Sequence, residues 1–209
     1  MALSTYSELK SAVADFLNRS DLTAVVPTFI SLAEAGMERV LRTRNMISKI
    51  EISVDDEYVD LPNDFLEMRS MKLLNQVSAS RIDFITLDAM DNLDLADMTS
   101  GITRYVSVVG DQFKFYPVTS AAYDAELVFY RTLPKLSDSN TTNWLLSLAP
   151  DAYLYGALMQ SAPYLKDDQR INIWAQLYTA AIQQLQTADE RRATSGGILK
   201  ARVAPFGAR

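Results

Sequence analysis

Residues 167–192 read DDQRINIWAQLYTAAIQQLQTADERR, and this stretch decides how the rest of the chain is interpreted. The acidic pair Asp167-Asp168 places negative charge where it favours the start of a helix. The apolar residues that follow recur at alternating steps of three and four, which is the spacing of a helix that packs along other helices. They are Ile171, Trp174, Tyr178, Ala181 and Leu185. One long helix cannot bury such a seam alone, so we expect partner helices elsewhere in the chain.

The N-terminal region supplies two of these partners. Thr5 and Glu8 have the spacing of a capping box, which predicts a first helix from about Tyr6 to Asn18. A second helix is expected from Ser20-Asp21 to about Arg42, with an apolar stripe at helical spacing. Gly36 lies within that stripe, and a glycine there indicates close approach of another helix.

A third partner is expected after the polar loop at residues 137–143. Pro150-Asp151 opens a segment with helical periodicity, and Pro163 should end or kink that helix.

The central region has a different period. Apolar and polar residues alternate from Ile50 to Val54, and the turn at residues 55–57 predicts a hairpin that returns through residues 58–61. Gly110 predicts the turn of a second hairpin between strands at residues 104–109 and 112–116, because glycine supplies the positive φ of a type II′ turn. Phe113 and Phe115 would then share one face, and Lys114 and Tyr116 the other, as in a half-buried strand.

We therefore predict an α+β fold with three parts. Residues 1–45 and 137–192 form a helical bundle made by the N- and C-terminal helices. Residues 46–136 form an inserted β-rich, antiparallel unit. Residues 193–209 form an extended C-terminal arm.

The composition excludes several kinds of chemistry. The 209 residues include no cysteine and no histidine, so disulfides, thiolate metal sites and a Ser-His-Asp triad are impossible. The nucleotide-binding glycine motifs are absent as well. We expect no cofactor, no metal and no enzymatic activity. Without an apolar run of membrane length or a signal-peptide pattern, we also expect no membrane association and synthesis in the cytoplasm.

Charge is distributed unevenly along the chain. The net charge is −6, yet residues 191–209 contain five basic residues and no acidic one. Residues 1–190 therefore carry −11. An acidic body with a basic end indicates an end that binds an acidic surface. We expect an arm that docks on a neighbouring protein and is disordered until assembly, with these contact residues: Arg191, Arg192, Ile198, Leu199, Lys200, Arg202, Val203 and Phe206.

Four aspartates spaced by three residues form the strongest candidate for a catalytic or metal-binding site, namely Asp88, Asp91, Asp94 and Asp97. Such a ladder could hold Mg²⁺ for phosphodiester hydrolysis. A solvated acidic face is the alternative interpretation and the one we favour, because the ladder lacks a calcium-loop pattern and turns gradually around a helix.

Bulky and small residues of the predicted helices are expected in the bundle core or at an interface between subunits, because Trp and Tyr bury large areas with one polar contact. They are Phe29, Gly36, Trp144, Tyr155, Trp174 and Tyr178.

Several short segments, taken in order, resemble a known family. Residues 6–10 and 26–42, the segment LPNDF at 61–65 and the corner NWLL at 143–146 are followed by PDAYLYGAL at 150–158 and LKDD at 165–168. The chain resembles the head-to-tail adaptor (connector) proteins of tailed bacteriophages of the podovirus type, which are akin to tail tubular protein A.

The resemblance implies a structural protein of the virion neck. It also implies that the protein forms a closed homo-oligomeric ring of about twelve copies. The portal protein would lie above this ring and the tail or nozzle protein below it. DNA would pass through the channel without sequence-specific binding. The alternatives are another phage neck or tail-completion protein, an unrelated binding module, and the Mg²⁺-dependent phosphodiesterase described above.

Overall fold

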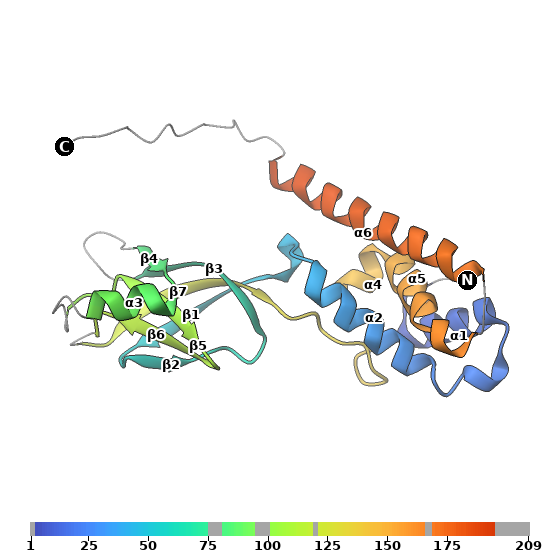
Figure 1. Cartoon of the computed structure of the whole chain (residues 1–209), viewed down its shortest axis with the longest axis horizontal. Coiled ribbons are helices and arrows are strands. Elements are labelled where there is room, and N and C mark those ends of the chain that lie inside the picture. Colours follow the sequence, from blue (N-terminus) through green and yellow to red (C-terminus); the bar gives the residue numbers. More distant parts are fainter. Residues whose placement is uncertain (1–2, 75–80, 95–100, 119–120, 166–168, 195–209) are drawn as a thin grey trace. The chain divides into compact units, whose positions relative to one another are not determined.

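The computed structural model of the chain describes residues 3–74, 81–94, 101–118, 121–165 and 169–194. The fold is mixed α+β, with six α-helices and a seven-stranded sheet in this described part (Figure 1). It divides into two compact units. The helical unit comprises residues 1–44 and 135–209, and the sheet unit comprises residues 45–134.

Five helices belong to the helical unit, and α5 is the one that contacts each of the others (Figure 1). Their bounds are α1 Tyr6–Leu17, α2 Val26–Val40, α4 Trp144–Leu148, α5 Pro150–Gln160 and α6 Arg170–Thr194. Helices from both ends of the chain therefore share one core.

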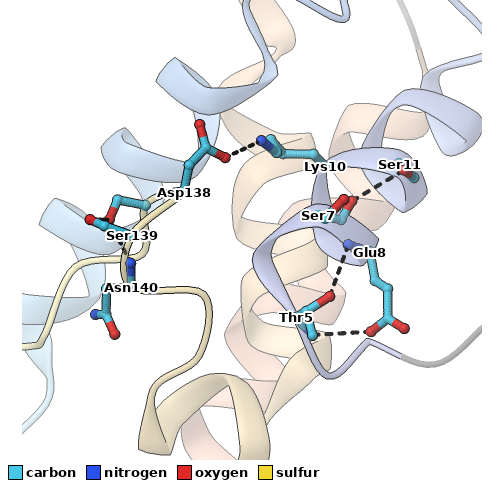
Figure 2. A network of polar contacts seen from close by, with 9 residues as sticks. Thr5, Ser7, Glu8, Lys10, Ser11, Asp138, Ser139 and Asn140 are labelled. Atoms are coloured by element: carbon cyan, nitrogen blue, oxygen red, sulfur yellow. Dashed lines mark hydrogen bonds and ion pairs between the residues drawn. The ribbon is translucent and has the colours of Figure 1, made fainter.

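The first helix begins as predicted. The Glu8 amide donates to the Thr5 hydroxyl at 3.3 Å, and the Thr5 amide donates back to the Glu8 carboxylate at 3.0 Å (Figure 2). Helix α1 ends at Asn18, whose φ of 52° is left-handed. The second helix is shorter than expected, because residues 20–22 form a separate 3-10 turn and α2 begins only at Val26.

The polar loop at residues 137–143 is attached to α1. The Lys10 ammonium lies 2.7 Å from the Asp138 carboxylate, and the Tyr6 amide donates to the Thr141 carbonyl at 2.7 Å. Figure 2 shows this loop beside the start of the helix, where the Asn140 amide donates to the Ser137 hydroxyl at 2.9 Å. These contacts join the N-terminal helix to the chain that returns from the sheet unit.

The sheet unit contains seven strands and the short helix α3, Leu87–Asp94. The order of the seven strands in the sheet is β1-β7-β3-β4-β5-β6-β2. The strand bounds are β1 Ile47–Val54, β2 Tyr58–Asp60, β3 Phe65–Leu73, β4 Arg81–Phe84, β5 Tyr105–Val109, β6 Gln112–Tyr116 and β7 Tyr123–Arg131.

The predicted hairpin of β5 and β6 is confirmed. The two strands pair antiparallel through a turn in which Gly110 has a φ of +59°, so a side chain there would be strained. The expectation of an antiparallel unit is wrong at one pair only, because β4 and β5 run parallel.

The other predicted hairpin is wrong. Strand β1 pairs along its whole length with β7, and β2 pairs with β6. Alternation of apolar and polar residues identifies the faces of a strand but not its partner.

The sheet has to curl for these pairings to form. A flat sheet of seven strands would separate its edges by about 29 Å. The short connection from Val54 to Tyr58 joins the two edge strands and spans at most about 14 Å. The concave face encloses the core, in which the rings of Phe65, Phe113 and Phe129 pack at centroid distances of 5.3 and 5.6 Å.

The opposite face of β6 is also covered, which corrects the prediction of a half-buried strand. The Tyr116 hydroxyl donates to the Leu93 carbonyl of α3 at 3.0 Å. The Lys114 ammonium is largely buried and lies 3.6 Å from Asp91 and 3.7 Å from Glu57. Both faces of β6 are therefore internal, because α3 folds over the side that the alternation assigned to solvent.

Candidate functional site

Three helices meet at Gly156, in the middle of α5. A side-chain carbon at that position would lie 3.1 Å from the Tyr178 ring on α6 and 3.2 Å from the Ala33 methyl group on α2. At Gly36, where the sequence indicates close approach of another helix, nothing lies within 4 Å of the corresponding point in the described part of the chain. The close approach inside this chain is therefore at Gly156, and a role of Gly36 at an interface between subunits stays a prediction. Both glycines lie in apolar helical segments, so the sequence alone did not distinguish them.

Trp174 is buried on the face of α6 that is directed at the other helices, together with Ala181 and Leu185. The Arg170 guanidinium lies 5.2 Å from the centroid of the Trp174 ring, a cation–π contact at the start of the helix. Tyr178 is partly buried one turn further on.

The other predicted core residues lie in α2, α4 and α5. Phe29 is fully buried, and its ring meets the Tyr164 ring edge-on at 5.2 Å. Trp144 begins α4, and its buried indole nitrogen has no hydrogen-bond partner among the described residues. Tyr155 is half-buried on α5.

A buried polar network connects α2, α5 and the returning chain. The Glu34 carboxylate, 2% exposed, accepts from the Leu136 amide at 2.8 Å and from the Tyr153 hydroxyl at 3.0 Å. The Asn143 side-chain amide donates to the same hydroxyl at 2.6 Å, while its oxygen caps α4 by accepting from the Leu146 amide. The network fixes the point at which the chain re-enters the helical unit.

Sequence reasoning missed this network. Asn143 before an apolar run is an N-cap signal that could have been used. For Glu34 the signal is a charged residue within an apolar helical stripe, at a position that faces the core.

Burial raises the pKa of Glu34 above its ordinary 4.5, although the two hydrogen bonds to the carboxylate partly oppose the shift. The folded state therefore binds this proton more tightly than the unfolded state, and the contribution of Glu34 to stability falls as the pH rises from about 4.5 through the raised pKa. Replacement with glutamine keeps an acceptor oxygen for both donors and removes the titration.

We expect the stability of Glu34→Gln relative to the wild type to increase as the pH rises from 4.5 to 7. Urea unfolding at several pH values, followed by tryptophan fluorescence, measures this difference, because both tryptophans lie in the helical unit. Glu38→Gln, at a partly exposed position of the same helix, is the control. A relative stability of Glu34→Gln that falls over this range would contradict the interpretation.

Only two residues predicted for the C-terminal arm lie in the described part of the chain. Arg191 and Arg192 are exposed in the last turn of α6, which continues to Thr194. Both lie within the range 137–192 that was predicted for the bundle, and they favour the helix by lying near its negative C-terminal end. Their predicted contact with a partner stays a prediction. The other predicted residues lie outside the described part: Ile198, Leu199, Lys200, Arg202, Val203 and Phe206.

The aspartate ladder is only partly described. Asp88 and Asp91 are exposed on α3, and Asp91 faces Lys114. The side chain of Asp94 and the whole of Asp97 lie outside the described part. Within that part, no three acidic side chains are grouped so as to hold a metal ion.

The two units differ strongly in charge. The sheet unit has 7 basic and 15 acidic residues, a net charge of −8, whereas the helical unit has 13 basic and 11 acidic residues, a net charge of +2. The acidic character of the protein thus belongs to the sheet unit.

None of the described helices is both long enough and apolar enough to cross a membrane.

Comparison with known proteins identifies the family. The model of the SU10 adaptor protein family matches residues 4–200. No curated protein matches the chain. The match includes the helices of both chain ends and the whole sheet unit between them. Because it covers nearly the entire sequence, the chain belongs to the SU10 adaptor protein family, in agreement with its resemblance to the structural head-to-tail adaptors of tailed phages.

Proposed function

We propose that this protein forms the ring that joins the portal to the tail in the neck of a tailed phage, and that its role is structural rather than catalytic. The match to an adaptor family over residues 4–200 is the observation that carries this proposal. A closed ring of about twelve copies would leave an axial channel for the genome.

The charge of the sheet unit supports contact with that channel. A surface with a net charge of −8 repels phosphate groups, so DNA passing beside it would slide instead of binding. The same charge disfavours a sequence-specific DNA-binding role.

The helical unit would serve as the body of each subunit. In this proposal residues 1–45 and 137–192 act as one bundle that carries residues 46–136 as an insertion. The contacts of α5 with helices from both ends of the chain support a single body, since a core shared in this way cannot be divided at one point in the sequence.

The C-terminal residues would bind the portal or a neighbouring subunit. The support comes from the sequence, in which Ile198, Leu199 and Phe206 supply apolar anchors between basic residues. Each such contact is weak, but a ring repeats it in every subunit, so the overall affinity of the ring for its partner is high.

A binding experiment with the purified portal protein of the same virus tests the proposal. We expect the full-length chain to co-sediment with the portal as a complex with several adaptor copies per portal ring, and electron micrographs to show the added ring on one end of the portal. Binding to isolated tail components without any binding to the portal would contradict it and would favour a tail-completion role.

A further inference from the structure

The exposed side of α6 carries no charged residue over five turns. Between Arg170 and Asp189 the helix has 18 consecutive uncharged residues, a length of about 27 Å. A helix with one solvated face normally places charged side chains there. Here the exposed residues are apolar or neutral, and the largest are Ile173, 56% exposed, and Leu177, 40% exposed.

These residues belong to a second seam along the helix. The positions alternate in steps of four and three, as in a helix that packs lengthwise on a partner. They are Ile173, Leu177, Ala180, Gln184 and Thr187. Open hollows of about 350 and 420 Å³ adjoin this seam around Ala180 and Gln183. The first seam of α6, through Trp174 and Leu185, is already used inside the helical unit.

Helix α2 presents a different exposed face with matching chemistry. Leu32 is 48% exposed, and Val40, two turns later, is 56% exposed. Gly36 lies between them with open space where its side chain would be. The result is an apolar line with a gap in its middle that can admit a side chain from another helix.

We propose that the exposed face of α6, from Ile173 to Thr187, binds the α2 face formed by Leu32, Gly36 and Val40 of a second copy of this chain. This inference rests on the proposed ring. A ring needs two different, complementary faces on each subunit, so that every copy binds one neighbour with each face. The two helices present two such faces, and both contact α5 in the same compact unit.

Electrostatics favours these faces over the sheet unit for contact between two copies of the chain. Copies of a protein with a net charge of −6 repel one another, and like charges placed opposite each other in an interface are costly. Contact is least unfavourable through the helical unit, whose net charge is +2, and along an α6 face that has no charge of its own. The sheet unit, at −8, is the part least suited to meeting its own copies.

Charged substitutions on each face test the proposal. Ile173→Glu blocks the α6 face and Leu32→Glu blocks the α2 face. The matched controls are Asn172→Glu and Ser31→Glu, which add the same charge at the adjacent exposed positions, about 100° around each helix. Circular dichroism checks that every variant remains folded, and assembly of the full-length chain on the portal is measured by sedimentation.

Either blocked variant alone should assemble at least about tenfold less than the wild type, since its charge would be buried without a partner, while both controls assemble normally. An equimolar mixture of the two blocked variants should give a heterodimer and no larger species, because each retains the face that the other has lost. Normal assembly by either blocked variant, or a mixture that forms no heterodimer, would overturn the inference while leaving the proposed ring intact. Failure of the wild type to assemble would overturn the proposed function itself.

Discussion

Deleting residues 195–209 is expected to abolish attachment to the portal while leaving the melting temperature of the free protein nearly unchanged. The deletion begins after Thr194, the last residue of α6, so every described packing contact of the helical unit is retained. It removes Ile198, Leu199 and Phe206 together with three of the basic residues. Each subunit of the ring contributes one weak contact to the portal, and these contacts act together. Removing the contact from every subunit therefore removes nearly all binding of the ring to the portal.

Two further variants separate charge from apolar contact. Changing Lys200 and Arg202 to glutamate keeps the apolar residues, and changing Leu199 and Phe206 to serine keeps the charge. We expect both to bind the portal more weakly than the wild type, and salt to weaken binding of the wild type more than binding of the glutamate variant. Normal attachment of the truncated chain would show that these residues do not bind the portal.

Replacing Trp174 with alanine is expected to lower the free energy of unfolding of the helical unit by about 3 to 5 kcal/mol. The side chain is buried in the first seam of α6 and also contacts the Arg170 guanidinium, so the change leaves a cavity and removes a cation–π contact. Trp144, the other tryptophan, remains as the fluorescent probe for chemical denaturation.

Ile173→Ala is the matched control, because this neighbouring side chain is 56% exposed, about 100° around the same helix from Trp174. Its effect on unfolding should stay within about 0.5 kcal/mol. A loss below about 1 kcal/mol for Trp174→Ala, combined with defective assembly, would instead place Trp174 at a subunit interface.

Local signals in the sequence predicted local structure well. Thr5 and Glu8 define the start of α1, and Gly110 defines the turn between β5 and β6, because each depends on backbone geometry within a few residues. The apolar spacing of α6 predicted its buried seam through Trp174 and Leu185 for the same reason. The mixed α+β class follows from these elements.

Features that depend on distant partners could not be derived in this way. The pairing of β1 with β7 joins strands about 75 residues apart, and alternation does not encode that choice. Gly36 and Gly156 lie in similar apolar segments, and only the packed helices show that Gly156 faces Tyr178. The acceptor role of Glu34 needs Leu136 and Tyr153, which lie about 100 and 120 residues away in the sequence.

An electron cryo-microscopy map of the intact virion tests the central claim most directly. We expect the two units to fit density between the portal and the tail as a closed ring, with one copy per asymmetric position and with the sheet unit's acidic surface bordering the DNA channel. Density for this protein elsewhere in the particle, or a virion neck that lacks it altogether, would contradict the assignment as the head-to-tail adaptor.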